Sequence, residues 1–288
     1  MKLNKIMEEM GESGECIGDV NFETMGLASS KPEKKKLTFI DDIKYIKDIS
    51  LGIDVILTTS EIAPSINGNS ICICNNPRML FFKIHNFLSR NSEYIRKEFD
   101  TQIKENCTIN SLAYISPKNV QIGCNVIIEE FVSIKPDTIV GDNSVIRAGS
   151  IIGGIGFEFK RTDENILPVE HTGAVKIGHD VEIQQNCCID KAIYPWDETV
   201  IGNYCKLDNL VHIAHAVKLE ERVFIASKSF IAGRTKIGAD AWIGPGVGII
   251  NALTVGKKAR VNVGSIVMKD VEAEQNVAGN PARVIKTN

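Results

Sequence analysis

The sequence predicts a β-solenoid, a left-handed parallel β-helix of hexapeptide repeats, preceded by a small α/β domain. The main observation is an aliphatic residue that returns every six positions from Ile201 to Val267 without a slip. A period of six fits neither the 3.6-residue period of an α-helix nor the two-residue period of a half-buried strand. Three hexads close a triangular coil of roughly 18 residues, whose aliphatic side chains point inward and stack on those of neighbouring coils.

The same period occurs earlier in the chain. It runs between Ile109 and Ile152 with one extra residue, and again between Ile177 and Ile189. The two breaks, at about 153–175 and 194–199, predict loops that leave the coil, and loops on a rigid scaffold often carry function. Left-handed crossovers are otherwise rare, so the hexad pattern alone indicates the hand.

Residues 1–105 lack the hexad and predict the small α/β domain. We expect the lysine run Lys34–Lys36 to be a solvated turn. The predicted elements are a helix over 3–10 that stops at Gly11, strands over 37–40, 54–57 and 70–74, and a helix over 78–99 that connects to the solenoid.

The β-helix is predicted over 106–272, and 273–288 form a C-terminal tail. Gly279 and Pro281 should turn the tail across the open end of the prism, where uncovered edges would recruit further strands. Cys187, Cys188 and Cys205 fall at or near inward positions. Because the chain has eight cysteines and no CxxC motif, we interpret them as reduced packing thiols.

The composition excludes several classes of protein. A formal net charge of −3 gives no footprint of nucleic-acid binding. No apolar run has the length of a membrane span, and the charged N-terminus has no signal-peptide core. We therefore expect a cytoplasmic protein.

The residue pair that suggests chemistry is His215 and Gly233. His215 follows the inward Ile213 in a turn and should project outward from an edge of the prism. One coil later in register is Gly233, whose backbone N–H would stack beside the histidine. A base and a preorganised N–H donor are what acyl transfer to an amine needs. The alternative is an ordinary surface turn histidine.

The other histidines have simpler interpretations. His212 should lie on the outer strand surface, His85 should be a packing residue of the connecting helix, and His171 is a loop residue for which substrate contact is one option. His179 and His215 are 36 residues apart, which resembles the spacing in the zinc-binding γ-class carbonic anhydrases. That site needs a third histidine after the second, and no histidine follows His215, so no metal is expected.

Several longer segments of the sequence resemble those of a known family. The chain resembles the UDP-3-O-acylglucosamine N-acyltransferases of lipid A biosynthesis over nearly its whole length. The segments that carry the resemblance are Gly153–Phe157, Gly173–Ile183, Ile189–Asp190 and above all Leu207–Val217.

The resemblance implies roles for individual residues. His215 matches the family's general base, and Gly233 matches the glycine that supplies the oxyanion N–H. Phe39 and Tyr45 match in spacing two aromatics that stack on uracil. Asp208 and Asn209 match a pair beside the active site, with Asp208 as an orienter of the base.

The chain departs from the family in two places. The family has a second active-site histidine about two coils after the first, where this chain has Ile249–Leu253, and it continues into C-terminal helices that dock acyl carrier protein. Here Val277–Arg283 instead resembles the ending of CoA-dependent sugar acetyltransferases. The cations that could then bind the phosphates of CoA are Lys257, Lys258, Arg260 and Arg283.

Together these features predict a homotrimeric N-acyltransferase that moves an acyl group from a thioester, preferably acyl-CoA, to the amine of a nucleotide-linked amino sugar. No tightly bound cofactor is expected. One alternative is the acyl-carrier-protein-dependent reaction of lipid A synthesis. Another is a non-catalytic β-helix that serves as an assembly subunit.

Overall fold

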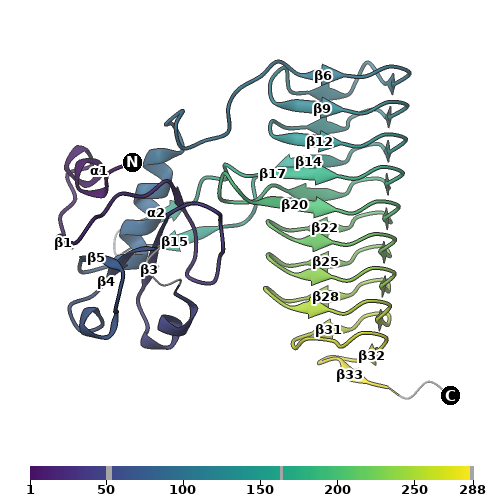
Figure 1. Ribbon diagram of the computed structural model, residues 1–288. Coiled ribbons are helices and arrows are strands. Elements are labelled where there is room, and N and C mark those ends of the chain that lie inside the picture. Colours follow the sequence, from purple (N-terminus) through teal and green to yellow (C-terminus); the bar gives the residue numbers. More distant parts are fainter. Residues whose placement is uncertain (50–53, 163–164, 286–288) are drawn as a thin grey trace. The chain divides into compact units, whose positions relative to one another are not determined.

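The computed structural model describes residues 1–49, 54–162 and 165–285, so the end of the predicted tail, 286–288, lies outside the described residues. The chain forms two compact units (Figure 1). The first comprises Met1–Arg96, Phe157–Thr172 and Tyr194–Trp196, and the second comprises Lys97–Gly156, Gly173–Ile193 and Asp197–Asn288. The boundary falls before the predicted position at 105, because strand β6 (Gln102–Ile103) already belongs to the coil.

The first unit is the predicted α/β domain. Its five-stranded sheet has the order β1-β5-β4-β3-β2, parallel except for the edge strand β1. The strands are β1 (Glu15–Ile17), β2 (Thr24–Met25), β3 (Lys36–Ile40), β4 (Val55–Thr58) and β5 (Ser70–Ile73). The helices are α1 (Leu3–Glu9), α2 (Pro77–Leu88) and the short 3-10 turns η1 (Ile43–Asp48) and η2 (Ala63–Ser65). Among the described residues, none of the helices has the length and apolarity to span a bilayer.

Helix α2 is shorter than predicted. It starts after Asn76, whose side-chain Oδ1 accepts the backbone N–H of Met79, and it ends at Leu88 instead of Phe99. The chain then turns at Asn91, whose side chain accepts the N–H of Glu93 and thereby competes with helical continuation.

Lys36 corrects the prediction of a solvated lysine turn. Its side chain is buried on β3, with the ammonium 3.5 Å from the buried Asp54 carboxylate. Burial lowers the pKa of Lys36, and the Asp54 carboxylate opposes that shift. The ammonium also donates to the main-chain carbonyls of Leu27, Ala28 and Ser30. A buried lysine is tolerated here because its donors are satisfied.

The two predicted loops pack into the first unit. The first contains an antiparallel hairpin that the sequence pattern did not indicate, β15 (Phe159–Arg161) with β16 (Ile166–Pro168). His85 on α2 is fully buried, as expected of a packing residue, with Nε2 2.8 Å from the Glu170 carbonyl and Nδ1 2.8 Å from the Tyr94 hydroxyl. Burial lowers the pKa of His85 to about 4. In the second loop, Trp196 Nε1 donates to the Met25 carbonyl at 2.8 Å.

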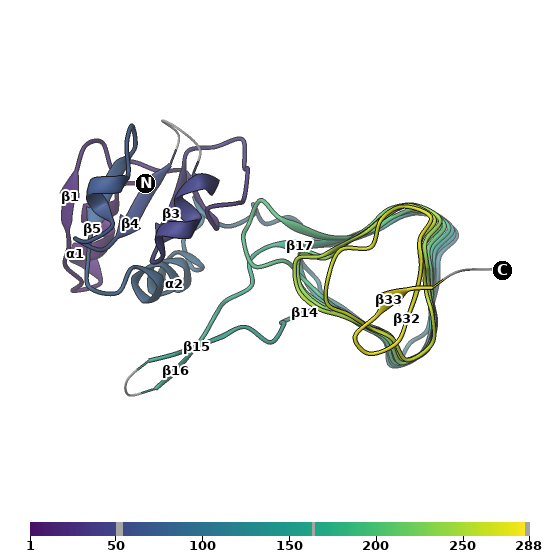
Figure 2. The ribbon, with the colours of Figure 1, turned by 90° about the horizontal axis from the view of Figure 1, so that it is seen from below.

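The second unit is the predicted left-handed parallel β-helix (Figure 2). Three parallel sheets form the faces of its prism. Face 1 consists of β6, β9 (Val120–Ile122), β12 (Thr138–Val140), β17 (Ala174–Ile177), β20 (Glu198–Ile201), β23 (Lys218–Leu219), β26 (Lys236–Ile237) and β29 (Thr254–Val255). Face 2 consists of β7 (Thr108–Ile109), β10 (Ile127–Ile128), β13 (Val145–Ile146), β18 (Glu182–Ile183), β21 (Lys206–Leu207), β24 (Phe224–Ile225), β27 (Trp242–Ile243), β30 (Arg260–Val261), β32 (Asn276–Ala278) and β33 (Arg283–Val284). Face 3 consists of β8 (Tyr114–Ile115), β11 (Ser133–Ile134), β14 (Ile151–Gly154), β19 (Cys188–Asp190), β22 (His212–Ile213), β25 (Phe230–Ile231), β28 (Gly248–Ile249) and β31 (Ile266–Val267).

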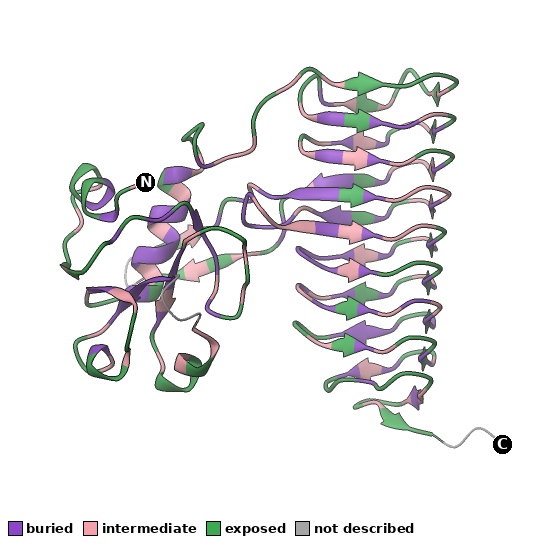
Figure 3. Cartoon of the chain, in the orientation of Figure 1, coloured by how far each residue is buried: buried purple, intermediate pink, exposed green. Residues whose placement is uncertain are grey.

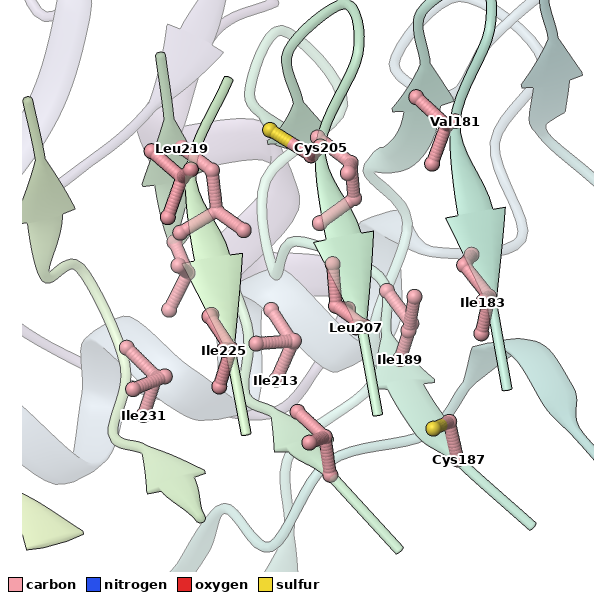
Figure 4. Close-up of a cluster of buried hydrophobic side chains, with 14 of the residues drawn as sticks. Val181, Ile183, Cys187, Ile189, Cys205, Leu207, Ile213, Leu219, Ile225 and Ile231 are labelled. Atoms are coloured by element: carbon pink, nitrogen blue, oxygen red, sulfur yellow. The ribbon is translucent and has the colours of Figure 1, made fainter. Parts of the chain in front are cut away.

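The core of the prism is the column of hexad aliphatics. Buried segments recur at the same place in successive coils (Figure 3). Ile183, Leu207 and Ile225 follow one another on neighbouring strands of face 2 (Figure 4). Cys187 and Cys205 are buried among them, whereas Cys188 is exposed, because it is the outward residue of β19. Cys188 thus lies next to the inward Ile189, as expected, but its exposure contradicts its interpretation as a packing thiol.

Most corners of the prism contain a residue in the left-handed conformation, three positions after an inward aliphatic. Leu210, Ala216 and Arg234 have φ values of 62°, 57° and 61°. This conformation is costly for residues other than glycine, so it persists where the surrounding coil over-determines it. The fixed corner holds the residue before it, such as His215, in one orientation.

The end of the prism is closed by the C-terminal segment. β32 pairs in parallel with β30, and β33 folds back antiparallel on β32 after Gly279, whose φ is 102°. The described part of the predicted tail, up to Ile285, therefore continues face 2 and pairs along the edge of its last long-range strand, β30.

Candidate functional site

His215 and Gly233 lie together at one corner. His215 is in the turn from β22 on face 3 to β23 on face 1, and only 7% of it is exposed. Its ring packs on the backbone of Gly233, since a Cβ atom added there would lie 2.5 Å from both Cε1 and Nε2 of His215. The 18-residue register that predicted this pair is observed in the pairing of His212 with Phe230. Any side chain at position 233 would displace the imidazole.

The backbone N–H groups of residues 232–234 differ in whether they have a hydrogen-bond acceptor. Ala232 donates its N–H to the Ile249 carbonyl, and Arg234 donates to the His215 carbonyl. Within the described part of the chain, the N–H of Gly233 has no acceptor. A donor beside a histidine is thus available to a ligand.

Both excursions leave the coil at this same corner. The first connects β14 to β17 and the second connects β19 to β20, each from face 3 to face 1. The second adds residues to its coil, so the 36-residue spacing of His179 and His215 spans a change of corner: His179 lies between faces 1 and 2. His171 is buried in the first unit, with Nδ1 2.9 Å from the Val169 carbonyl. In the described ranges, no group of three or more His, Cys, Asp or Glu side chains is arranged to hold a metal ion.

Asp190 lies in one of the segments that carry the family resemblance, but the sequence analysis assigned it no role in the site. It ends β19, immediately before the second excursion, and is 8% exposed. Its Oδ2 lies 2.9 Å from Nε2 of His212, whose ring is on the outer surface of face 3, as expected. An acidic residue where the hexad breaks was the available signal, since a carboxylate there has no place in the apolar core.

Asp208 and Asn209 lie at a different corner from His215. They occupy the turn between β21 and β22, at the opposite end of β22. The Asp208 carboxylate accepts from the backbone N–H groups of Asn209 at 2.7 Å and Ser227 at 3.1 Å. Within one chain the structure therefore does not bring Asp208 to the imidazole that it was expected to orient.

Phe39 and Tyr45 both belong to the first unit but differ in their surroundings. Phe39 is half-buried on β3, with its ring centroid 5.1 Å from that of Phe81 and 6.1 Å from that of Phe82. Tyr45 is exposed in η1, and the Lys44 ammonium lies 4.8 Å from its ring centroid. Phe39 thus contributes to packing, whereas Tyr45 is open to a ligand.

The four cations expected to bind CoA phosphates are distributed over the C-terminal end of the prism. Lys257 and Lys258 are at a corner between faces 1 and 2. Arg260 is on face 2, with its guanidinium 5.9 Å from the Trp242 ring centroid. Arg283 is on the closing strand β33 and donates to the Ala282 carbonyl at 3.0 Å. They occupy a corner, a face and the closing strand.

The chain is similar to known transferases. Residues 119–154 match the family model described as bacterial transferase hexapeptide (six repeats). A UDP-3-O-acylglucosamine N-acyltransferase of Helicobacter pylori is 32% identical over 274 residues, which cover 85% of this chain and 78% of that one. A protein of the same name from Caulobacter sp. strain K31 is 34% identical over 148 residues, covering 51% of this chain but only 43% of the relative. The chain thus matches less than half the length of that relative.

A solved structure supports the fold. The UDP-N-acetylglucosamine acyltransferase of Bacteroides fragilis superposes with a TM-score of 0.53 at 23% identity, covering 67% of this chain and 71% of that one. That similarity concerns the fold alone, and the family is shown by the match to the Helicobacter pylori protein, which covers 78% of that relative. This chain belongs to the family of UDP-3-O-acylglucosamine N-acyltransferases.

Proposed function

We propose that the protein transfers an acyl group from a thioester to the amine of a UDP-linked amino sugar. The observation that carries this proposal is the imidazole of His215 packed on Gly233, whose N–H has no acceptor in the described part of the chain. Family membership supplies the substrate class. Phe39 and Tyr45 are proposed to hold the nucleotide base.

The proposed reaction needs one general base and one hydrogen-bond donor from the protein. His215 removes a proton from the amine as its nitrogen attacks the thioester carbonyl, because an ammonium has no lone pair to attack with. The Gly233 N–H stabilises the oxyanion that forms. The C–N bond is then complete, the C–S bond breaks, and the thiolate leaves and takes up the proton.

We also propose a cyclic trimer, which the contrast between the three faces supports. The outward residues of face 1 are largely polar, whereas faces 2 and 3 expose large apolar side chains. Such surfaces are typical of contacts between chains. If face 2 of one chain packs on face 3 of the next, the contact closes in a ring and leaves the polar face in solvent. Examples are Lys176, Lys218 and Lys236 on face 1, Ile127, Phe224 and Trp242 on face 2, and Tyr114, Ile151 and Phe230 on face 3.

This arrangement would complete the site. His215 lies at the edge of face 3, so face 2 of the neighbouring chain would form the opposite wall. Asp208 could then act in the site of a neighbour, although it does not reach His215 within its own chain. Sedimentation equilibrium tests the trimer, and a Trp242→Glu change should shift the population toward monomer.

For the donor we propose acyl carrier protein. Family membership supports it, whereas the acyl-CoA donor that the sequence analysis preferred depends on four cations that are distributed over a corner, a face and the closing strand. The test offers the same acyl group on CoA and on acyl carrier protein. A clear preference for CoA, with CoA binding seen by calorimetry, would reverse the assignment.

The function itself is tested by a thiol-release assay. Acyl donors are incubated with UDP amino sugars, and mass spectrometry identifies an acylated amine in the product. The expected result is donor-dependent and sugar-dependent thiol release. Absence of turnover with every donor, together with absence of nucleotide-sugar binding, would favour the non-catalytic assembly subunit.

A further inference from the structure

Face 3 carries a histidine–carboxylate pair that is more buried than the comparable ion pair on face 2. There Arg147 bridges Glu129 and Glu182, whose side chains are 27% and 26% exposed, whereas the side chain of Asp190 is 11% exposed. A β-helix needs no ionic contact between outward side chains, because its stability comes from the inward column. Yet Asp190 is nearly buried and fixes Nε2 of His212 at 2.9 Å. The cost of desolvating a carboxylate makes such a pair a poor stabilising device by itself.

The pairing of β19 with β22 places Asp190 at the end of face 3 that leads to His215. Cys188 pairs with His212, so Asp190, two residues farther along its strand, lies level with Ala214. The contact with Asp190 therefore draws the His212 ring along face 3 toward the corner that contains His215. Gly154 flanks Asp190 on the other side, where a Cβ atom would lie 3.3 Å from Oδ1.

The hydrogen bond also sets the chemistry of His212. In the tautomer that donates Nε2–H to the Asp190 carboxylate, Nδ1 of the imidazole is an acceptor. The side chain is 46% exposed. Within the described residues, Nδ1 has no hydrogen-bond partner. The contact with Asp190 thus orients a partly exposed ring on the strand that leads into the turn of the proposed base.

We propose that His212 binds a free hydroxyl of the acceptor sugar and that Asp190 is the positioning residue that holds it, an inference that rests on the proposed function. The hydroxyl donates to Nδ1 of His212, and the amine of the same sugar lies at His215. The two histidines thereby fix the sugar ring at two points. This selects which amine is acylated.

The test is a double-mutant cycle between the enzyme and the acceptor. Wild type and His212→Ala are assayed with the parent UDP amino sugar and with its monodeoxy analogues. In wild type, one analogue should lose about tenfold in kcat/KM, the usual worth of a hydrogen bond to an oriented polar group. In His212→Ala the same analogue should lose nothing further, and the acceptor KM should rise while the donor KM stays unchanged.

Two variants separate binding from folding. His212→Gln keeps an amide donor for Asp190 and an oxygen acceptor for the hydroxyl, so it should restore part of the lost affinity. His179→Ala removes an exposed histidine that pairs with Asp180 at 2.7 Å at another corner, and should leave every acceptor KM unchanged. Circular dichroism verifies the fold of each variant.

The outcomes distinguish this inference from the proposed function. If every deoxy analogue loses the same factor in wild type and in His212→Ala, His212 binds no hydroxyl and the inference is wrong. If wild type transfers no acyl group, the proposed function fails, and the same panel is measured by calorimetry. Equal affinity of wild type and His212→Ala for the parent sugar would then overturn the inference as well.

Discussion

The two units of this protein differ in how they use ionisable residues, although both bury some polar side chains. In the β-helix the core is a column of aliphatic side chains. The side chains that could take part in catalysis or binding, such as His215 and His212, lie at corners and on outer surfaces. In the first unit, polar groups are inside: Lys36 pairs with Asp54, and His85 bonds to Tyr94. Substitutions of the candidate site residues in the coil should therefore change activity with little change in stability. In the first unit, substitutions of polar residues should change stability as well.

The strongest test of this separation is His215→Ala. Turnover should fall by a factor on the order of 10² to 10⁴, the contribution of a positioned general base. The melting temperature should hardly change, because the side chain lies outside the aliphatic column. Gly233→Ala should also lower turnover, since its Cβ would displace the imidazole. Turnover like that of wild type in His215→Ala would remove the residue from the mechanism.

Lys36→Ala should have the largest effect on stability. Removing the ammonium takes away the positive charge 3.5 Å from the buried Asp54 carboxylate, and breaking a buried ion pair typically costs about 3–5 kcal/mol in the free energy of unfolding. The matched control is Lys35→Ala, whose ion pair with Asp19 is exposed and should contribute less than about 1 kcal/mol. Urea unfolding measures both. Equal losses in the two variants would contradict the assignment of Lys36 to the core.

Acid should unfold the first unit before the coil. The pKa of His85 is about 4 in the folded protein and about 6.5 when unfolded, so the unfolded chain binds the proton more tightly. Its contribution is complete above pH 6.5 and is lost as the pH falls toward 4, by about 3 kcal/mol in total.

The two tryptophans allow this experiment to be read region by region. Trp196 belongs to the first unit and Trp242 to the second. Fluorescence of the Trp242→Phe variant should report an acid transition that the Trp196→Phe variant lacks. In a His85→Gln background, the dependence on pH between 4 and 6.5 should flatten. An unchanged pH dependence there would assign the acid sensitivity to other groups.

The smallest effects are expected from Phe39→Ala and Tyr45→Ala. The two variants separate nucleotide binding from packing within the first unit. Each should weaken nucleotide-sugar binding by roughly 1–3 kcal/mol, the usual worth of stacking on a base, and leave donor binding unchanged. Phe39→Ala should also lower the stability of the first unit, because its ring packs on Phe81 and Phe82. Tyr45→Ala should not. Nucleotide affinity equal to wild type in both variants would give the domain another role.

Much of the coil could be predicted because its information is local and periodic. The inward aliphatics, the breaks at both excursions and the stacking of Gly233 on His215 all follow from counting residues. The same counting failed where a break added residues. It placed His179 and His215 two whole coils apart, whereas they lie at different corners.

The sequence by itself determined the solenoid. Each coil packs only on its neighbours, and the six-residue period gives the positions of the side chains that make this contact. Only the tertiary structure decided which distant partners meet: Lys36 with Asp54, His85 with Glu170 in an excursion, and Asp190 with His212. No period relates these pairs. Their partners are selected by burial, since a polar group removed from water must find a donor or acceptor wherever the folded chain brings one.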